Sequence, residues 1–223
     1  MTDCNQTPAE LTYKKNMSIV QANELIRSKQ DPLTPNEAKL VRLMIAQVLK
    51  DDTDFRTFKC HIKDLAEYLN ISKDNIYRDI QKLSKDLMRR SIFILDAAQP
   101  YKRGKPNYKI FHWVDYIEYT DGYITIKLSD NLKPYLIGLE ALFSVYCYDV
   151  ARGLPNNYAI RLYELIASYQ NMMVRPSYES SHTDIPHEKN EFVFSVDWLR
   201  ERFCCTDKYK NTNGFVARVI DDM

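Results

Sequence analysis

Apolar residues between Cys60 and Arg90 recur with the period of two adjacent helices. The first helix carries one apolar stripe at positions i, i+3, i+4 and i+7, made of Ile62, Leu65, Ala66 and Leu69. The second carries a stripe made of Ile76, Ile80, Leu83 and Leu87. Three residues separate the helices. The last of them, Ser72, is a suitable N-cap because its hydroxyl can accept a hydrogen bond from the free amides of the first turn.

Two amphipathic helices joined by so short a turn are typical of a helix-turn-helix, whose second helix enters the major groove of DNA. A helical hairpin inside an unrelated core has the same apolar pattern. The residues on either side of the pair are therefore needed to choose between these two interpretations.

The chain before the helix pair predicts a strand, a turn of helix and then a buried helix. Residues 17–27 fit a short strand that leads into a helical turn. Pro32 and Pro35 interrupt the chain, and Thr34 can cap the helix that follows. Residues 36–50 are apolar almost all round, which predicts a buried central helix. Residues 55–60 then form a candidate strand.

After Arg90 the pattern changes to that of strands. Residues 91–96 predict a strand, and residues 97–107 form a basic loop with two prolines and a glycine. Residues 108–119 are rich in β-branched and aromatic side chains, and Asp121-Gly122 is a strong signal for a two-residue hairpin before the next strand. Helix, helix, strand, loop, strand is the order of a winged helix, with the loop at 97–107 as the wing.

A second copy of the pattern follows later in the chain. The spacings of Phe58, Ile62, Leu65 and Leu69 recur in Phe192, Val196, Leu199 and Phe203. Each set follows a similar helix and precedes a capped apolar helix, which in the second copy starts from Asn213. This repeat predicts two tandem winged-helix units, although a coincidence of apolar spacings gives the same result.

The fold expected from these patterns is α+β, with one winged-helix domain and the start of a second. We expect a flexible N-terminal arm at residues 1–16, a winged-helix domain at 17–150, and the first part of another at 151–223. The second copy reaches Met223 before any wing strands. We therefore expect the chain to be a fragment of a longer protein.

Charge is distributed unevenly along the chain. The formal net charge is only +1, but residues 73–109 carry ten Lys or Arg and four Asp, a net charge of +6. Cations gathered on the second helix and the following loop predict a contact with nucleic acid. An ordinary solvated helix face is the alternative.

The chemistry of these cations suggests which of them contact bases. Lys73, Asn75 and Arg78 lie at the start of the second helix, where side chains reach base edges. The remaining cations suit phosphates, and they are Lys82, Lys85, Lys102, Arg103 and Lys105. We expect Tyr77 to pack inward, and we expect affinity for DNA to fall steeply with salt.

Five short stretches, in order, resemble the plasmid replication initiator (Rep) family. They are Asn16–Ile26, Leu33–Leu40, Ile71–Arg78, Leu132–Leu136 and Tyr158–Ile166. The resemblance implies two winged-helix domains that bind repeated double-stranded origin sequences called iterons, with most base readout in the C-terminal one. It also implies a homodimer formed through the N-terminal domain, monomers that initiate replication, and contacts with host replication proteins. Since we expect most of the second unit to lie outside this chain, we expect the N-terminal domain and its dimerisation to be retained.

A winged-helix transcription regulator is the alternative function. A regulator of this kind would also bind DNA through a winged helix, but it explains neither the tandem copy nor the five ordered stretches.

An enzyme is not expected. The four histidines include no His-hydrophobe-His pair of the kind that DNA-nicking initiators use, and the five glycines form no phosphate-binding loop. His182, His187, Cys204 and Cys205 match no common zinc spacing. We therefore expect no catalytic residue, metal or cofactor. Five unpatterned cysteines, a polar N-terminus and the lack of a bilayer-length apolar run indicate the cytoplasm.

Overall fold

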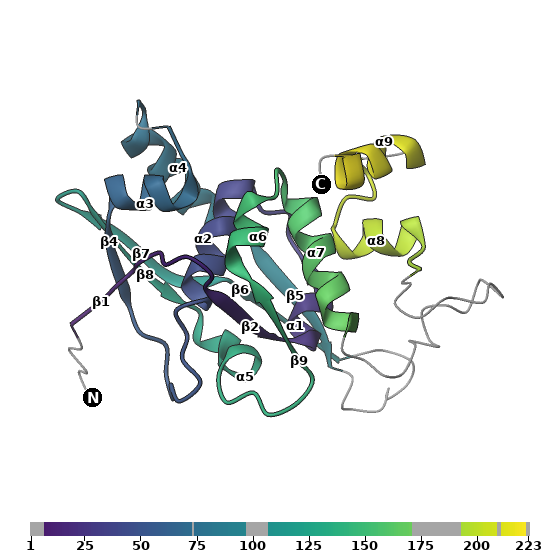
Figure 1. Ribbon diagram of the computed structural model, residues 1–223, viewed down its shortest axis with the longest axis horizontal. Helices are drawn as coiled ribbons and strands as arrows, with labels where there is room; N and C mark the ends of the chain where they lie inside the picture. Colours follow the sequence, from purple (N-terminus) through teal and green to yellow (C-terminus); the bar gives the residue numbers. More distant parts are fainter. Residues whose placement is uncertain (1–6, 73, 97–106, 171–192, 209–210, 222–223) are drawn as a thin grey trace.

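The computed structural model describes residues 7–72, 74–96, 107–170, 193–208 and 211–221. The elements before the helix pair are β1 (Ala9–Glu10), β2 (Ser18–Ala22), α1 (Asn23–Arg27), β3 (Lys29–Gln30), α2 (Pro35–Ile45) and β4 (Phe58–His61). The pair itself is α3 (Ile62–Leu69) and α4 (Ile76–Leu87). Figure 1 shows α3 and α4 at one end of an elongated molecule and the C-terminal helices at the other.

The second half begins with strands and ends with helices. The strands are β5 (Ser91–Asp96), β6 (Asn107–His112), β7 (Val114–Thr120), β8 (Tyr123–Leu128) and, after two short helices, β9 (Phe143–Cys147). Those short helices are the 3-10 turn η2 (Asp130–Leu132) and α5 (Lys133–Leu136). The last helices are α6 (Tyr148–Gly153), α7 (Asn157–Gln170), α8 (Val196–Arg202), α9 (Thr212–Val216) and the π-helical η3 (Ala217–Asp221).

Helix α2 is the buried central helix of the fold. Thr34 and Glu37 form a capping box at its start, in which each side chain accepts a hydrogen bond from the other's backbone amide. The helix ends at Ile45, not at Lys50 as its composition predicts. Side chains after Ile45 explain the difference, because Arg56 donates to the carbonyl of Gln47 and Asp52 accepts from the amide of Leu49.

The turn between α3 and α4 is longer than predicted. Six residues separate Leu69 from Ile76, and Asn70 ends α3 in the left-handed conformation, with φ +57°. The Ser72 hydroxyl accepts from the amide of Asp74 and so does not cap α4, whose N-cap position is Asn75. The prediction of Ser72 as the N-cap is therefore wrong, because its hydroxyl forms a local turn before the helix begins.

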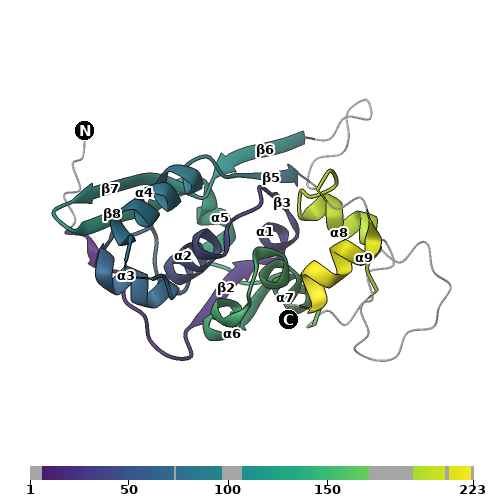
Figure 2. The same ribbon diagram turned by 90° about the horizontal axis from the view of Figure 1, so that it is seen from above.

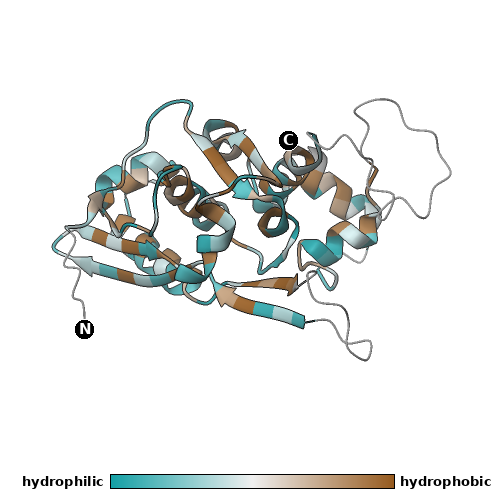
Figure 3. Ribbon diagram, turned by 90° about the horizontal axis from the view of Figure 1, so that it is seen from below, coloured by the Kyte–Doolittle hydropathy of each residue, from teal (hydrophilic) through white to brown (hydrophobic). Residues whose placement is uncertain are grey.

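The strand predicted at residues 108–119 is divided into two. Trp113 lies between β6 and β7, is fully buried, and accepts a hydrogen bond at its carbonyl from the amide of Ser129. Strand β6 pairs with β5, whereas β7 pairs with β8. In Figure 3, β7 and β8 are the banded strands beside the N-terminus. Along β8 every second side chain is buried, so hydrophobic and more polar positions alternate. This alternation is typical of strands with one buried face.

The sheet topology changes the assignment of the wing. One sheet has the order β1-β4-β8-β7, with β4 antiparallel to β8 from Phe58–Ile126 to His61–Tyr123. The hairpin that pairs with the strand before α3 is therefore β7–β8, and the hairpin β5–β6 is inserted between it and α4. Strands β5 and β6 belong to another sheet, of order β3-β5-β6. Element order predicts the loop at 97–107 as the wing, whereas strand pairing identifies the hairpin β7–β8 as the wing, so that prediction is wrong. Residues 97–106 themselves lie outside the described residues.

Part of the predicted flexible arm is packed against the domain. Strand β1 pairs with β4 in parallel, and Leu11 is 1% exposed. The Tyr13 hydroxyl donates to Asp149 over 2.5 Å. Within this arm, β1, Leu11 and Tyr13 are thus held by pairing, burial and a hydrogen bond, and residues 1–6 lie outside the described part of the chain.

Two apolar cores share helix α7. The first core is built from β2, α1 to α4 and the sheets, and it includes Ile160 and Ala167 of α7. The second core contains Tyr158 and Leu162 from the same helix, together with Phe203, Cys205, Phe215 and Val219. The boundary predicted at residue 150 falls within α6.

The second unit contains the two helices that the repeat predicts. Ser195 caps α8 by accepting from the amide of Trp198. The N-cap of α9 is Asn211, which accepts from the amide of Asn213, so the predicted cap lies two residues too late. Phe192, the first residue of the repeated pattern, lies outside the described residues.

Candidate nucleic-acid interface

Helix α4 presents a stripe of cations on the face opposite its buried side. Ile80, Leu83 and Leu87 point into the first core. The exposed cations are spaced by four, three and four residues, and they are Arg78, Lys82, Lys85 and Arg89. At 100° per residue this spacing forms one row, centred almost half a turn from the apolar stripe. All four side chains are exposed, and α4 lies at the surface of the molecule (Figure 1).

The structure brings together some of the residues predicted to contact DNA. Arg78, Lys82 and Lys85 share the exposed row, and Asn75 lies at the exposed N-cap position. The Arg78 side chain is 73% exposed and lies 3.6 Å from Asp79, too far for a strong hydrogen bond. The other predicted contacts lie outside the described residues, and they are Lys73, Lys102, Arg103 and Lys105.

Arg89 extends the row by one residue and was not assigned a role from the sequence. Its position four residues after Lys85 was a usable signal, because the same spacing places both on one helix face. The helical pattern ends at Leu87, however, and Arg89 sits in the turn after the C-cap Met88.

Tyr77 is not packed inward as predicted. It is 52% exposed, and its ring meets that of Tyr119 edge-on, with centroids 5.0 Å apart. Tyr77 lies about a quarter turn from the buried stripe of α4, and β7 brings Tyr119 beside it. The pair joins the first turn of α4 to the hairpin β7–β8. Nothing local in the sequence could have identified Tyr119 as the partner.

The hairpin β7–β8 is attached to the start of α3. Asp121 and Gly122 form its turn with positive φ values of +49° and +83°, and the Gly122 carbonyl accepts from the amide of Ile62. Glu118 and Asp121 place acidic side chains near the turn. The Tyr116 and Thr120 hydroxyls donate to Glu118 and hold the pKa of its carboxyl below the usual value. This hairpin thus presents negative charge, and the positive charge of the interface comes from α4.

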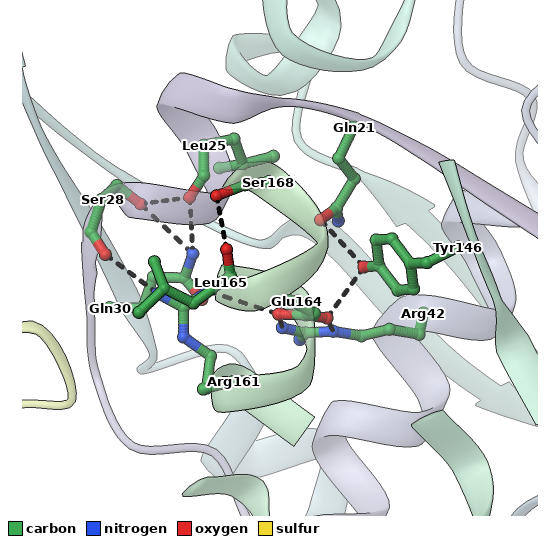
Figure 4. Close-up of polar contacts among 10 residues, drawn as sticks. All are labelled: Gln21, Leu25, Ser28, Gln30, Arg42, Tyr146, Arg161, Glu164, Leu165 and Ser168. Atoms are coloured by element: carbon green, nitrogen blue, oxygen red, sulfur yellow. Dashed lines mark hydrogen bonds and ion pairs between the residues drawn. The ribbon is translucent and has the colours of Figure 1, made fainter. Parts of the chain in front are cut away.

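A buried polar network holds α7 against α2 and β9 (Figure 4). Arg42 donates to Glu164 through Nε and Nη2, and the Tyr146 hydroxyl donates to the same carboxylate over 2.8 Å. Arg161 donates to the carbonyl of Ser28 over 3.0 Å. Burial lowers the pKa of Arg161 to about 10, so its guanidinium is still charged at neutral pH. The network is closed to solvent and therefore positions helices instead of binding a ligand.

The described residues contain no group of three or more side chains suited to hold a metal ion. His182 and His187 lie outside that part of the chain. Burial raises the pKa of the Cys205 thiol to about 11. In the described part of the chain no helix is long and apolar enough to cross a membrane.

A helix-turn-helix, a strand order of winged-helix type and a solvent-facing cationic helix together define the winged-helix class of DNA-binding folds. The chain belongs to the family described as "Initiator Replication protein, WH1", which matches residues 18–167. The α+β, winged-helix fold predicted from the sequence is thereby confirmed.

Two individual proteins are similar to this chain. A "Replication initiation protein" of Escherichia coli is 29% identical over 150 residues, which cover 66% of this chain and 45% of that protein. The chain thus spans less than half the length of this curated relative. The structure titled "Crystal structure of Pi initiator protein in complex with iteron DNA" aligns with a TM-score of 0.62 at 19% identity, over 94% of this chain and 84% of the other. At that identity the likeness supports the fold.

Proposed function

We propose that this protein is a plasmid replication initiator that binds repeated double-stranded origin DNA, the iterons, through its winged-helix units. The observation that carries the proposal is the row of three exposed cations on α4, the second helix of the helix-turn-helix, which Arg89 continues in the turn that follows. A helix with one buried apolar face and one continuous cationic face fits a major groove, because phosphates border the groove on both sides.

The comparisons support initiation over other uses of a winged helix. Membership of a replication initiator family favours an origin over a promoter as the target. The Pi initiator, whose fold is similar, was crystallised with iteron DNA. The protein acts by binding and not by catalysis, and in the cytoplasm it recruits host replication proteins to the origin.

Individual side chains of the interface have distinct roles in this proposal. Asn75 and Arg78, near the start of α4, contact base edges, since an amide pairs with adenine and a guanidinium with guanine. Lys73 joins them at the groove. The later cations neutralise phosphates, and they are Lys82, Lys85, Lys102, Arg103 and Lys105.

The N-terminal unit also forms a homodimer in this proposal. Large apolar side chains are exposed on the side of the molecule that carries β9, with Leu49 at 58%, Leu142 at 75% and Val145 at 52%. A pocket of about 540 Å³ lined by Val20, Leu49 and Phe143 adjoins them. Exposed apolar surface of this kind favours association with another protein surface, and a second copy of the chain is the partner that we propose.

Selection of DNA from a random-sequence pool tests the proposal directly. We expect wild-type protein to enrich one duplex sequence, and we expect that sequence to occur as direct repeats in the plasmid that carries the gene. Footprinting on that plasmid should protect the repeats. Enrichment of a sequence that occurs once, at a promoter, would instead identify a transcription regulator. Failure to enrich any sequence would contradict both functions.

A further inference from the structure

A second cationic site lies where the two units meet. A pocket of about 380 Å³ is bounded by the loop before α2, the start of α7 and the segments around α9. Three cations line it: Arg90, Lys208 and Arg218. Arg90 lies more than a hundred residues before Lys208 and Arg218, which flank α9. The family match ends at residue 167, so it covers only one of the three.

The cations are held in place by neighbouring groups. The Lys208 ammonium lies 5.8 Å from the centre of the Tyr158 ring, and Tyr158 also lines the pocket. Arg90 pairs with Glu37 through Nε at 3.2 Å. The Glu37 carboxylate is 1% exposed and also accepts from the amide of Thr34, so it lies behind the pocket wall and partly offsets the charge of Arg90.

Helix α7 adds its positive end to the same pocket. Asn156 caps the helix by accepting from the amide of Ala159, and its amide group donates to the carbonyl of Arg218. The next residue, Asn157, also lines the pocket and is 7% exposed. The N-terminus of a 14-residue helix beside three cations is suited to an anion, because helix amides and positive charge act together.

The pocket lies between the two helices that would read DNA. Arg90 comes three residues after the end of α4, and Lys208 and Arg218 stand on either side of α9. Figures 1 and 2 show α4 and α9 on the same side of the molecule, with the ends of α2 and α7 between them. A duplex that contacts both helices must carry its sugar-phosphate backbone across this interval.

We propose that this pocket binds a phosphate of the DNA backbone between the segments contacted by α4 and by α9. The proposal rests on the proposed function, and it adds a contact outside both recognition helices. Such a contact fixes the spacing of the two units along the duplex, because both units contribute cations to a single phosphate. The pocket therefore couples binding by one unit to binding by the other.

The double variant Lys208→Gln/Arg218→Gln tests this contact on the full chain with the duplex that wild-type protein selects. We expect affinity to fall about tenfold and the slope of log affinity against log salt to become shallower by about 1, the amount due to one phosphate. The matched control Lys59→Gln/Lys127→Gln removes the same charge from the outer face of the sheet and should leave the slope unchanged.

Replacing single phosphates by neutral methylphosphonates provides a second measurement that needs no variant. A methylphosphonate at one position between the two protected grooves should weaken binding by wild-type protein about tenfold. The same substitution should cause no further loss of binding by the double variant. Additive losses at every position would overturn the proposal, as would an unchanged salt slope in the variant.

Two other outcomes are distinguishable. If wild-type protein selects no duplex, the proposed function fails and the pocket assignment fails with it. If inorganic phosphate raises the thermal unfolding temperature of the wild type while the pocket variant binds DNA normally, the site holds a small free phosphate. That result overturns the assignment to the DNA backbone and leaves the proposed function intact.

Discussion

Arg42 and Glu164 form a two-pronged ion pair in the interior of the protein. Arg42 Nε lies 2.7 Å from Glu164 Oε1, and Arg42 Nη2 lies 2.9 Å from Oε2. The two side chains are 1% and 0% exposed. Arg42 belongs to α2, which packs on the helix-turn-helix, and Glu164 belongs to α7, which carries the second core. The pair thus ties α2, which packs on the helix-turn-helix, to the helix that carries the second core.

Glu164→Gln should destabilise the protein strongly. Removing one partner of a buried ion pair leaves the other charge buried without compensation, which costs about 3–5 kcal/mol of unfolding free energy. Urea denaturation followed by circular dichroism measures this change. The matched control Glu201→Gln breaks the exposed pair with Lys29 and should cost less than about 1 kcal/mol. Equal losses in the two variants would show that the buried pair has no special role.

The same carboxylate should make stability depend on acid. Burial alone would raise the pKa of Glu164, but the charge and hydrogen bonds of Arg42 outweigh burial and lower it. A lowered folded-state pKa contributes stability above the ordinary glutamate value of about 4.3, and that stability is lost as pH falls through the folded-state value.

We therefore expect the unfolding free energies of wild type and Glu164→Gln to converge as pH falls below about 4. Asp54 and Asp149 also have lowered pKa values, but they are present in both proteins and cancel in the difference. Urea titrations at pH 7 and in the acid range measure the difference in unfolding free energy between wild type and Glu164→Gln at each pH. If the difference in unfolding free energy stayed constant down to pH 3, the pKa of Glu164 would not be lowered by Arg42.

Arg78→Ala and Lys82→Ala should weaken DNA binding in different ways. Loss of a base-contacting arginine relaxes preference at one base pair by about 1–3 kcal/mol. Loss of a phosphate-contacting lysine weakens all sequences alike and makes the salt slope shallower by about 1. Binding to the selected duplex and its single-base variants separates these effects. Lys59→Ala, on the outer face of the sheet, should match wild type, and uniform loss in both α4 variants would reassign Arg78 to a phosphate.

Leu142→Asn should separate fold stability from association. Leu142 is 75% exposed, so its replacement removes little buried apolar surface from the monomer. Its φ of +54° is a left-handed conformation that costs an L residue about 1–2 kcal/mol. Asparagine tolerates this conformation better, and we expect the unfolding free energy of the monomer to rise by up to about 1 kcal/mol. Sedimentation analysis should show weaker dimerisation. Unchanged dimerisation would exclude Leu142 from the dimer surface.

Local periodicity predicted most of the helix pair correctly. Ile62, Leu65 and Leu69 are buried on one face of α3, as are Ile80 and Leu87 on α4. The Asp121-Gly122 turn was equally predictable, because two positive φ values suit these residues. Such features depend on residues within one or two turns of each other, so the sequence contains the whole signal.

The turn lengths and the identity of the wing were not predictable in the same way. Ser72 is a chemically suitable cap, yet its hydroxyl forms a nearer bond with the amide of Asp74. Element order placed the wing directly after α4, whereas strand pairing places β7–β8 beside β4 and inserts β5–β6 before it. Strands that pair across more than sixty residues cannot be matched to each other from local periodicity.

The sequence by itself determined the helix pair and the cationic stripe of α4, because helical spacing and charge are properties of neighbouring residues. Tertiary structure alone decided which surfaces those elements form together. It brought Tyr119 to Tyr77, Glu164 to Arg42, and the cations Arg90, Lys208 and Arg218 to one pocket. Each of these contacts exists because burying the apolar faces of distant segments in shared cores fixes the polar groups beside them.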